Sequence, residues 1–243
     1  MASKVRLYVD QPLGEGQLVP LSREQAHYLF GVMRLTVGTH LSLINGRDGE
    51  WDAQVAEAVK HKGVLVCVSQ TKPLQAPPDL WLLFAPIRKD RMMFLVEKAT
   101  ELGVAVLQPV QTTYTNHADR VRMDKMQAHV IEAVEQCGAT FVPEVRTPVT
   151  LNALMKDWPS ERPLSFCDEA ALGQPAGFGA EAAADGGAIL IGPEGGFSPD
   201  EREMLQALAF TQTISLGPRI LRAETAAIAA LTLWQATAGD WVS

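Results

Sequence analysis

Short runs of alternating apolar and polar residues fill the first 70 positions of the chain, a pattern typical of β-strands. Strands are expected at 5–9, 39–44, 51–58 and 63–71. A helix is expected at 22–33, with Ser22 as its N-cap. The sequence Asn45-Gly46-Arg47-Asp48-Gly49 is a strong turn signal between two of these strands. Short strands around such turns favour a small barrel.

The pattern changes after residue 79, where apolar runs alternate with segments of helical periodicity. Further strands are expected at 80–85, 104–110, 141–145, 164–167, 188–191 and 213–216. Helices are expected at 90–102, at 121–137, after Ser198 in a capping-box sequence, and at about 223–238. This alternation predicts an α/β domain with a parallel sheet that is covered on both faces.

Three prolines lie between Lys72 and Asp79 and predict a stiff, extended connector between two domains. The expected domains are residues 1–72 and residues 79–243. A second segment, Ala170–Gly187, is rich in Ala and Gly and is expected to form a flexible surface connection.

Charge narrows the classes of function. The 243 residues carry 21 Lys and Arg against 28 Asp and Glu, and this net charge of −7 argues against general nucleic-acid binding. Residues 1–73 carry 8 Lys and Arg against 7 Asp and Glu. Attraction for an anionic polymer is therefore expected from the first domain and from local basic clusters.

Composition also bears on metals and location. Three widely spaced cysteines without a Cys-x-x-Cys pair, and histidines without ligand spacing, predict no metal site. The N-terminal residues lack the apolar core of a signal peptide, and no apolar run approaches the roughly 20 residues of a membrane span. The protein is therefore expected in the reducing cytoplasm, away from membranes.

Two Gly-Pro loops near the C-terminus form the clearest candidate site. Gly192-Pro193-Glu194-Gly195-Gly196 follows the run at 188–191, and Gly217-Pro218-Arg219 follows the run at 213–216. Glycine permits tight turns and close approach of a ligand, and ligands of parallel sheets bind at the carboxyl ends of the strands. Either loop alone is explained equally well by a tight turn, so it is their occurrence together that indicates a site.

The absence of two common motifs limits the class of ligand. The sequence has neither a phosphate loop ending in Gly-Lys-Ser/Thr nor a Gly-x-Gly-x-x-Gly fingerprint. A nucleoside-containing ligand without a phosphate chain therefore fits the loops better than ATP or NAD does.

Several longer segments point to a family. They are Leu190–Ser198, Leu216–Ala226, Lys89–Val104 with its Glu-Leu-Gly sequence, Glu132–Gly138 and His27–Arg34. Together they resemble the SPOUT-class methyltransferases, and within that class the family that methylates N3 of a uridine in 16S ribosomal RNA. The resemblance runs nearly end to end.

The resemblance carries several implications. The second domain would be an α/β fold with a deep trefoil knot, a rare exception to the rule that chains are unknotted. S-adenosyl-methionine would bind between the two loops. The enzyme would be a homodimer with its site near the interface, acting on 16S rRNA of the small ribosomal subunit. The first domain would be a PUA-like barrel that helps to hold RNA.

Cofactor contacts are expected mainly through backbone and apolar groups of the two loops. The residues are Leu190, Gly192, Pro193, Glu194, Gly195, Gly196, Leu216, Gly217, Leu221 and Arg222. Glu194 either contacts amino or ribose groups of the cofactor or only favours the N-terminus of the next helix.

Arg222 and Glu224 are the expected catalytic residues. Uridine N3–H is weakly acidic, so the protein has to align the reactants and stabilise developing negative charge. Arg222 is suited to that stabilisation because its guanidinium is always charged. Glu224 is a candidate base, or else the group that orients Arg222. A simple helix-start ion pair between Arg222 and Glu224 is the structural alternative.

Expected RNA contacts are Arg6, Arg34, Arg88, Lys89 and Arg91, although each alone is also explained as a solvated surface charge.

Two other functions remain open. One is a related methyltransferase with another target, such as a ribose 2′-hydroxyl. The other is a non-catalytic RNA-binding assembly factor that keeps the fold.

Overall fold

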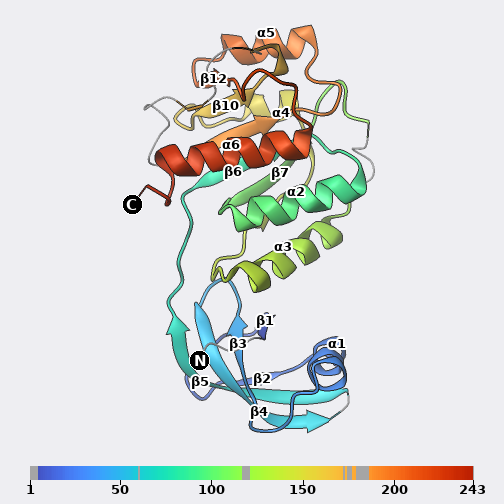
Figure 1. The fold of residues 1–243 in the computed structure, drawn as a ribbon, viewed down its shortest axis with the longest axis vertical. Coiled ribbons are helices and arrows are strands. Elements are labelled where there is room, and N and C mark those ends of the chain that lie inside the picture. Colours follow the sequence, from blue (N-terminus) through green and yellow to red (C-terminus); the bar gives the residue numbers. More distant parts are fainter. Residues whose placement is uncertain are drawn as a thin grey trace. The chain divides into compact units, whose positions relative to one another are not determined.

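The structure is a computed structural model that describes residues 5–59, 61–116, 121–171, 173, 177–178 and 186–242. The chain forms two compact units, drawn in Figure 1. The first contains the chain up to Ala76 together with Val134–Val142, and the second contains Pro77–Ala133 together with the chain from Pro143 onward. The return of residues 134–142 to the first unit was not expected from the sequence.

A sheet whose strands are between 3 and 11 residues long builds the first unit. In order across the sheet they are β1 (Arg6–Tyr8), β3 (His40–Ile44), β4 (Glu50–Val59), β5 (Lys62–Lys72) and β2 (Leu18–Pro20). β1 runs parallel to β3, and the other pairs are antiparallel. The strands expected from the alternation are confirmed. β2 was not expected from the sequence; it has three residues and ends in a proline.

Ser22 begins the helical segment of this unit, as the sequence predicts. Its side chain accepts a hydrogen bond from the Gln25 N–H, and the Gln25 side chain accepts one from the Ser22 N–H. This capping box starts α1 (Arg23–Ala26), and the chain continues as the π-helical η1 (His27–Val32). Leu29 of η1 is completely buried and joins the core that the strands form.

A parallel sheet forms the second unit, which confirms the expected α/β class. In order its strands are β12 (Thr211–Ile214), β10 (Leu164–Cys167), β11 (Gly187–Ile191), β6 (Leu80–Phe84), β7 (Val106–Gln111) and β8 (Glu144–Val145), and β9 (Val149–Thr150) pairs with β7. Each of these pairings is parallel. β11 is buried along its whole length, as its continuous apolar sequence predicts.

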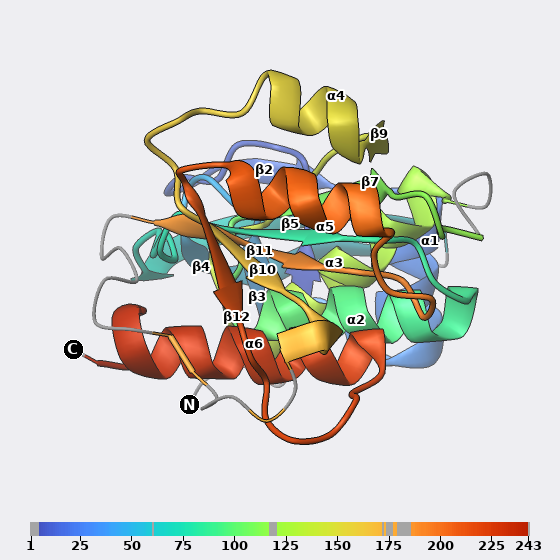
Figure 2. The ribbon, with the colours of Figure 1, turned by 90° about the horizontal axis from the view of Figure 1, so that it is seen from above.

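Helices cover both faces of this sheet. They are α2 (Lys89–Glu101), α4 (Leu151–Lys156), α5 (Pro199–Ala207) and α6 (Ala223–Ala238), with α3 (Met123–Cys137) continuing into the first unit. In Figure 2, α4 and α5 lie on one face, and α2 and α6 lie on the other. Ser198 and Glu201 form the expected capping box of α5. α4 has only six residues and was missed.

Two features expected from the sequence, the connection at Ala170–Gly187 and the trefoil knot, stay predictions. The connection at Ala170–Gly187 begins in a 3₁₀ turn at Glu169–Ala171, and most of its remaining residues lie outside the described part of the chain. The trefoil knot implied by the resemblance stays a prediction. Among the described helices, none is long and apolar enough to cross a membrane.

The largely buried Arg6 side chain connects several segments of the first unit. Its Nε pairs with Glu50 Oε2 at 3.0 Å, and its side chain is only 12% exposed. Its remaining donors reach the carbonyl oxygens of Val134 at 2.5 Å, Glu135 at 3.1 Å and Ala139 at 2.7 Å. These carbonyls lie in and just after the last turn of α3, where helical carbonyls lack internal partners. A cation is also favoured there by the helix dipole.

Replacing Arg6 with methionine is expected to lower the unfolding free energy of the first unit by about 3 kcal/mol, because the buried Glu50 carboxylate loses its nearest cation and the carbonyl oxygens at the end of α3 lose their donor. Thermal unfolding followed by calorimetry measures this effect. Arg23→Met is the matched control, since Arg23 lies on the exposed surface of the same unit. Equal melting temperatures for the two variants would show that the Arg6 network is not stabilising.

Glu50 predicts an acid sensitivity of this unit. Burial by itself raises the pKa of Glu50, but the Thr71 hydroxyl, Arg6 and Lys72 together hold that pKa below its ordinary value. The unfolded chain therefore takes up the proton first, and the stabilisation is complete above the unfolded pKa of about 4.3. It is lost as the pH falls through the lower folded pKa. Urea unfolding from pH 3 to 6 should show a steeper loss toward acid for wild type than for Glu50→Gln.

Candidate functional site

The sheet brings the two Gly-Pro loops to opposite sides of one strand. β10 lies between β11 and β12, and Cys167 at its end is in register with Ile191 on one side and Ile214 on the other. Because the strands are parallel, their carboxyl ends finish level at the same edge. The expected closeness of the two loops is therefore confirmed, with a third strand end between them.

A partly open cavity of about 220 Å³ lies at this edge. Its apolar lining includes Ile191, Ile214, Leu216, Leu221 and Ala226. Its polar lining includes Asp168, Glu169, Glu194, Arg219 and Arg222. An apolar hollow with a few polar groups at its wall is the usual form of a small-molecule site.

The glycines of these loops differ in the space available for a Cβ and in their backbone φ. A Cβ on Gly192 would lie 2.6 Å from the Phe197 ring, and one on Gly196 would lie 2.0 Å from the Glu169 carboxylate. Gly196 also has a φ of +68°, which an L side chain rarely adopts. Gly217 has a φ of +101° and has open space where a Cβ would point. The first loop thus needs glycine for internal packing, and only Gly217 leaves room beside the backbone.

Most of the expected cofactor residues line the cavity. They are Gly192, Pro193, Glu194, Gly196, Leu216, Gly217, Leu221 and Arg222. Leu190 does not, because successive strand residues point to opposite faces: it is completely buried in the core, and its neighbour Ile191 lines the cavity instead. Gly195 lies against Tyr114 rather than in the cavity wall.

The end of β10 supplies residues that the sequence reading missed. Cys167, Asp168 and Glu169 line the cavity between the two loops. Arg202 of α5 holds both acids, with Nε 3.0 Å from Asp168 and Nη2 2.6 Å from Glu169 Oε1. The run Leu164–Cys167 was expected as a strand, but the sequence does not show that this strand lies between the other two.

Cys167 is not suited to act as a nucleophile. Burial raises the pKa of its thiol to about 12. The side chain is therefore protonated at neutral pH, whereas the thiolate is the reactive form.

Arg222 and Glu224 do not form the ion pair that was considered as a structural alternative. Arg222 is the exposed N-cap residue of α6 and lines the cavity. Glu224, in the first turn of the same helix, pairs instead with Arg91 of α2 at 3.7 Å. The second oxygen of Glu224, Oε2, is buried and has no hydrogen-bond partner in the described structure.

The residues expected to contact RNA divide into two groups. Arg34, Arg88 and Lys89 are exposed. Arg6 donates its hydrogen bonds within the first unit and its side chain is only 12% exposed, so it is not placed to contact an RNA phosphate. Arg91 is half-buried and faces carboxylates, which also sets it apart from an exposed phosphate contact.

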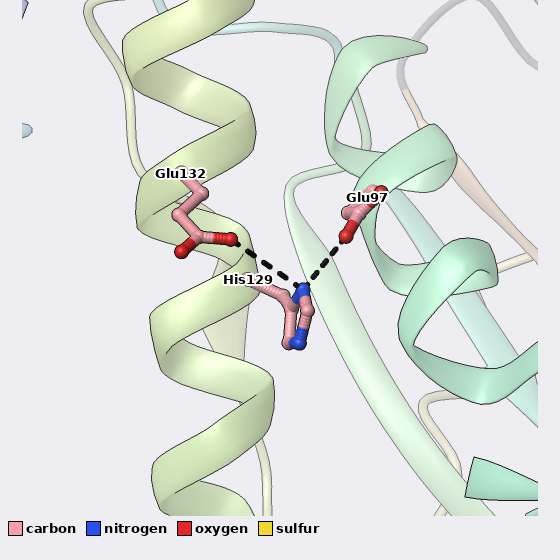
Figure 3. A group of neighbouring side chains, drawn as sticks. All are labelled: Glu97, His129 and Glu132. Carbon is pink, nitrogen blue, oxygen red and sulfur yellow. Dashed lines mark hydrogen bonds and ion pairs between the residues drawn. The ribbon is translucent and has the colours of Figure 1, made fainter. Parts of the chain in front are cut away.

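A separate group of possible ligands joins α2 and α3, shown in Figure 3. Glu97, His129 and Glu132 bring their ligand atoms within 4.8 Å of one another. His129 Nδ1 lies 2.7 Å from Glu97 Oε1 and 3.7 Å from Glu132 Oε2. The spacing of histidines along the sequence could not show this group, because Glu97 comes from another helix. A hydrogen bond between His129 and Glu97, which joins the two helices, accounts for it.

Comparison with known proteins places the chain in a family. Residues 74–235 match the RNA methyltransferase domain family, and residues 21–66 match the RNA methyltransferase PUA domain. Ribosomal RNA small subunit methyltransferase E of Rickettsia conorii is 31% identical, with 93% of each chain covered. The enzyme of the same name from Buchnera aphidicola is 30% identical, with 97% of each covered.

Solved structures agree with this assignment. A putative methyltransferase from Legionella pneumophila, in complex with the bound cofactor SAM, has a TM-score of 0.83 at 31% identity and covers 97% of this chain and 98% of its own. Ribosomal RNA small subunit methyltransferase E from Neisseria gonorrhoeae, bound to S-adenosyl methionine, has a TM-score of 0.82 at 28% identity, with 98% and 99% covered. The match to the domain family and to relatives over nearly their whole length shows that the chain belongs to the ribosomal RNA small subunit methyltransferase E family.

Proposed function

We propose that this protein methylates 16S ribosomal RNA of the small ribosomal subunit, with S-adenosyl-methionine as the methyl donor and N3 of a uridine as the acceptor. The cavity at the level ends of β10, β11 and β12 is the observation that carries this proposal. Membership of the family supplies the reaction type and the class of RNA.

The cavity lining fits the donor. Leu216, Leu221 and Ile214 offer an apolar wall for an adenine ring. Glu169 and Glu194 bring carboxylates to a ligand that carries positive charge on its sulfonium and amino groups. Backbone beside Gly217 is accessible, because no atom of the described residues lies within 4 Å of the place where a Cβ on Gly217 would point. When bound, S-adenosyl-methionine supplies a methyl group whose bond to sulfur breaks as the bond to N3 forms, with the electron pair remaining on sulfur.

The residues of the chain would handle the proton and the charge of the base. N3 of uracil must lose its proton for its electron pair to attack carbon, and Glu224 Oε2 is a buried acceptor without a partner in the described structure. The negative charge left on the uracil ring spreads onto its carbonyl oxygens. Arg222, which lines the cavity with its donors unused by any described ion pair, would stabilise that charge.

Three further features complete the proposal. Arg34, Arg88 and Lys89 are exposed and would contact RNA phosphates. Ile220 lines the cavity although it is 74% exposed, which suits an apolar contact with a second copy of the chain in a homodimer. The cytoplasm, where ribosomal subunits are made, would be the site of action.

Arg222→Ala is expected to lower the rate of methyl transfer to rRNA by roughly 100–1,000-fold, the usual effect of removing a group that stabilises an oxyanion. Transfer of a labelled methyl group into small subunits from cells that lack this protein measures the rate. Arg222→Lys keeps the charge without the planar fork and should fall between wild type and alanine. An alanine variant as fast as wild type would remove Arg222 from the mechanism.

Mass spectrometry of 16S rRNA nucleosides from cells lacking this protein tests the reaction itself. The expected result is the loss of one N3-methyluridine, restored by the wild-type gene. Loss of a 2′-O-methyl nucleoside would identify the related methyltransferase with a different target. An unchanged methyl pattern, together with no heat of S-adenosyl-methionine binding in calorimetry, would favour the non-catalytic assembly factor.

A further inference from the structure

Arg91 occupies a position that joins both parts of the site. It lies in the first turn of α2, and its guanidinium stands between two carboxylates from distant segments. Nη1 is 3.9 Å from Glu194 Oε1, and Nε is 3.7 Å from Glu224 Oε1. Glu194 belongs to the loop that follows β11, and Glu224 follows Arg222 at the start of α6. One side chain thus reaches both of the segments that line the cavity.

Helix packing holds Arg91 in this place. α2 and α6 lie side by side on the same face of the sheet (Figure 2). At their other ends, the buried Gln235 side chain of α6 donates to the Leu102 carbonyl oxygen at the end of α2, at 2.7 Å. Leu102 follows Arg91 by the same number of residues as Gln235 follows Glu224, so the two helices run parallel and in register. The Arg91–Glu224 contact is therefore set by the packing of both helices along their length.

The two oxygens of the Glu224 carboxylate lie in different environments. Its side chain is only 13% exposed, and Oε1 faces the Arg91 cation. Oε2 is buried without a hydrogen-bond partner in the described structure, a costly condition for an oxygen of a charged group. The dipole of α6 explains why an acid is favoured in its first turn. It does not explain an oxygen that is kept unpaired. Glu224 does not itself line the cavity, but its neighbours Arg222 and Ala223 do, so a donor that enters beside them would satisfy that oxygen.

We propose that Arg91 is a positioning residue for methyl transfer: it holds Glu224 through Oε1, and Glu194 beside it, so that Oε2 of Glu224 stays free to accept the proton from the target base. This inference rests on the proposed function and extends it to α2. It replaces the expectation that Arg91 binds an RNA phosphate. The guanidinium is 34% exposed and already lies between two acids, so it presents less positive potential to RNA than Arg88, which is exposed three positions earlier.

Single-turnover methyl transfer into unmethylated small subunits separates the two roles. A positioning residue changes the maximal rate, whereas a phosphate contact changes the subunit concentration at half-saturation and the dependence of binding on salt. Arg91→Gln is expected to lower the maximal rate 10- to 100-fold, with the half-saturating concentration within twofold of wild type. Arg91→Lys, which keeps the charge, should recover part of the rate.

The pair is tested by combining Arg91→Gln with Glu224→Gln. If Arg91 acts through Glu224, the double variant is no slower than Glu224→Gln alone, because residues that work as one unit are not additive. Independent losses that multiply would overturn the proposal. Arg88→Gln serves as the contrast, with a raised half-saturating concentration and a salt slope reduced by about one.

Arg91→Gln would also overturn the proposal if it behaved like Arg88→Gln, with weaker and less salt-dependent binding at an unchanged maximal rate. If Arg91→Gln lowers the melting temperature, Arg91→Lys is used for the same measurement. A lower maximal rate of Arg91→Lys, with the half-saturating subunit concentration unchanged, then supports the proposal. Absence of methyl transfer by the wild-type protein would contradict the proposed function instead, so the two failures are distinguishable.

Discussion

The parallel register of β11, β10 and β12 is the constraint on which the site depends. Cys167 is level with both Ile191 and Ile214, so the ends of these strands stop at one edge of the sheet. Backbone hydrogen bonds from β10 to its two neighbours hold that register, and a slip of one residue would turn every side chain of the largely buried β10 and β11 to the opposite face. The two Gly-Pro loops enclose a cavity only because the strands that carry them finish together.

Arginines that reach in from helices control the acidic groups around this cavity. Arg202 of α5 holds Asp168 and Glu169 from one face of the sheet. Arg91 of α2 stands beside Glu194 and Glu224 from the other face. A chain with a net charge of −7 thereby keeps carboxylates near a site for a positively charged donor: Arg202 hydrogen-bonds to Asp168 and Glu169, and Arg91 lies 3.9 Å from Glu194 and 3.7 Å from Glu224. Arg222 and Arg219 line the cavity wall, and neither forms an ion pair with the residues that the structure describes.

The first unit uses the same chemistry for a structural purpose. Arg6 satisfies carbonyl groups at the end of α3 while it pairs with the buried Glu50. A guanidinium can do this because it presents several donors in one plane, more than a lysine offers in fixed directions. The same residue type therefore serves as a helix-end partner at Arg6 and as a carboxylate partner at Arg91, and the surroundings alone distinguish these roles from the RNA contact expected for both.

The sequence by itself determined the α/β class, the main strands and helices, the N-cap at Ser22, the capping box at Ser198 and the two glycine loops. Each of these depends on periodicity or on the backbone preferences of a few neighbouring residues, which are local properties. The sequence could not show that β10 lies between the loops, that Leu190 turns into the core, or that Glu224 faces Arg91 instead of Arg222. Strand order, the face to which a side chain points and the partner of a charge all arise from contacts between distant segments, and only the packed tertiary structure decides them.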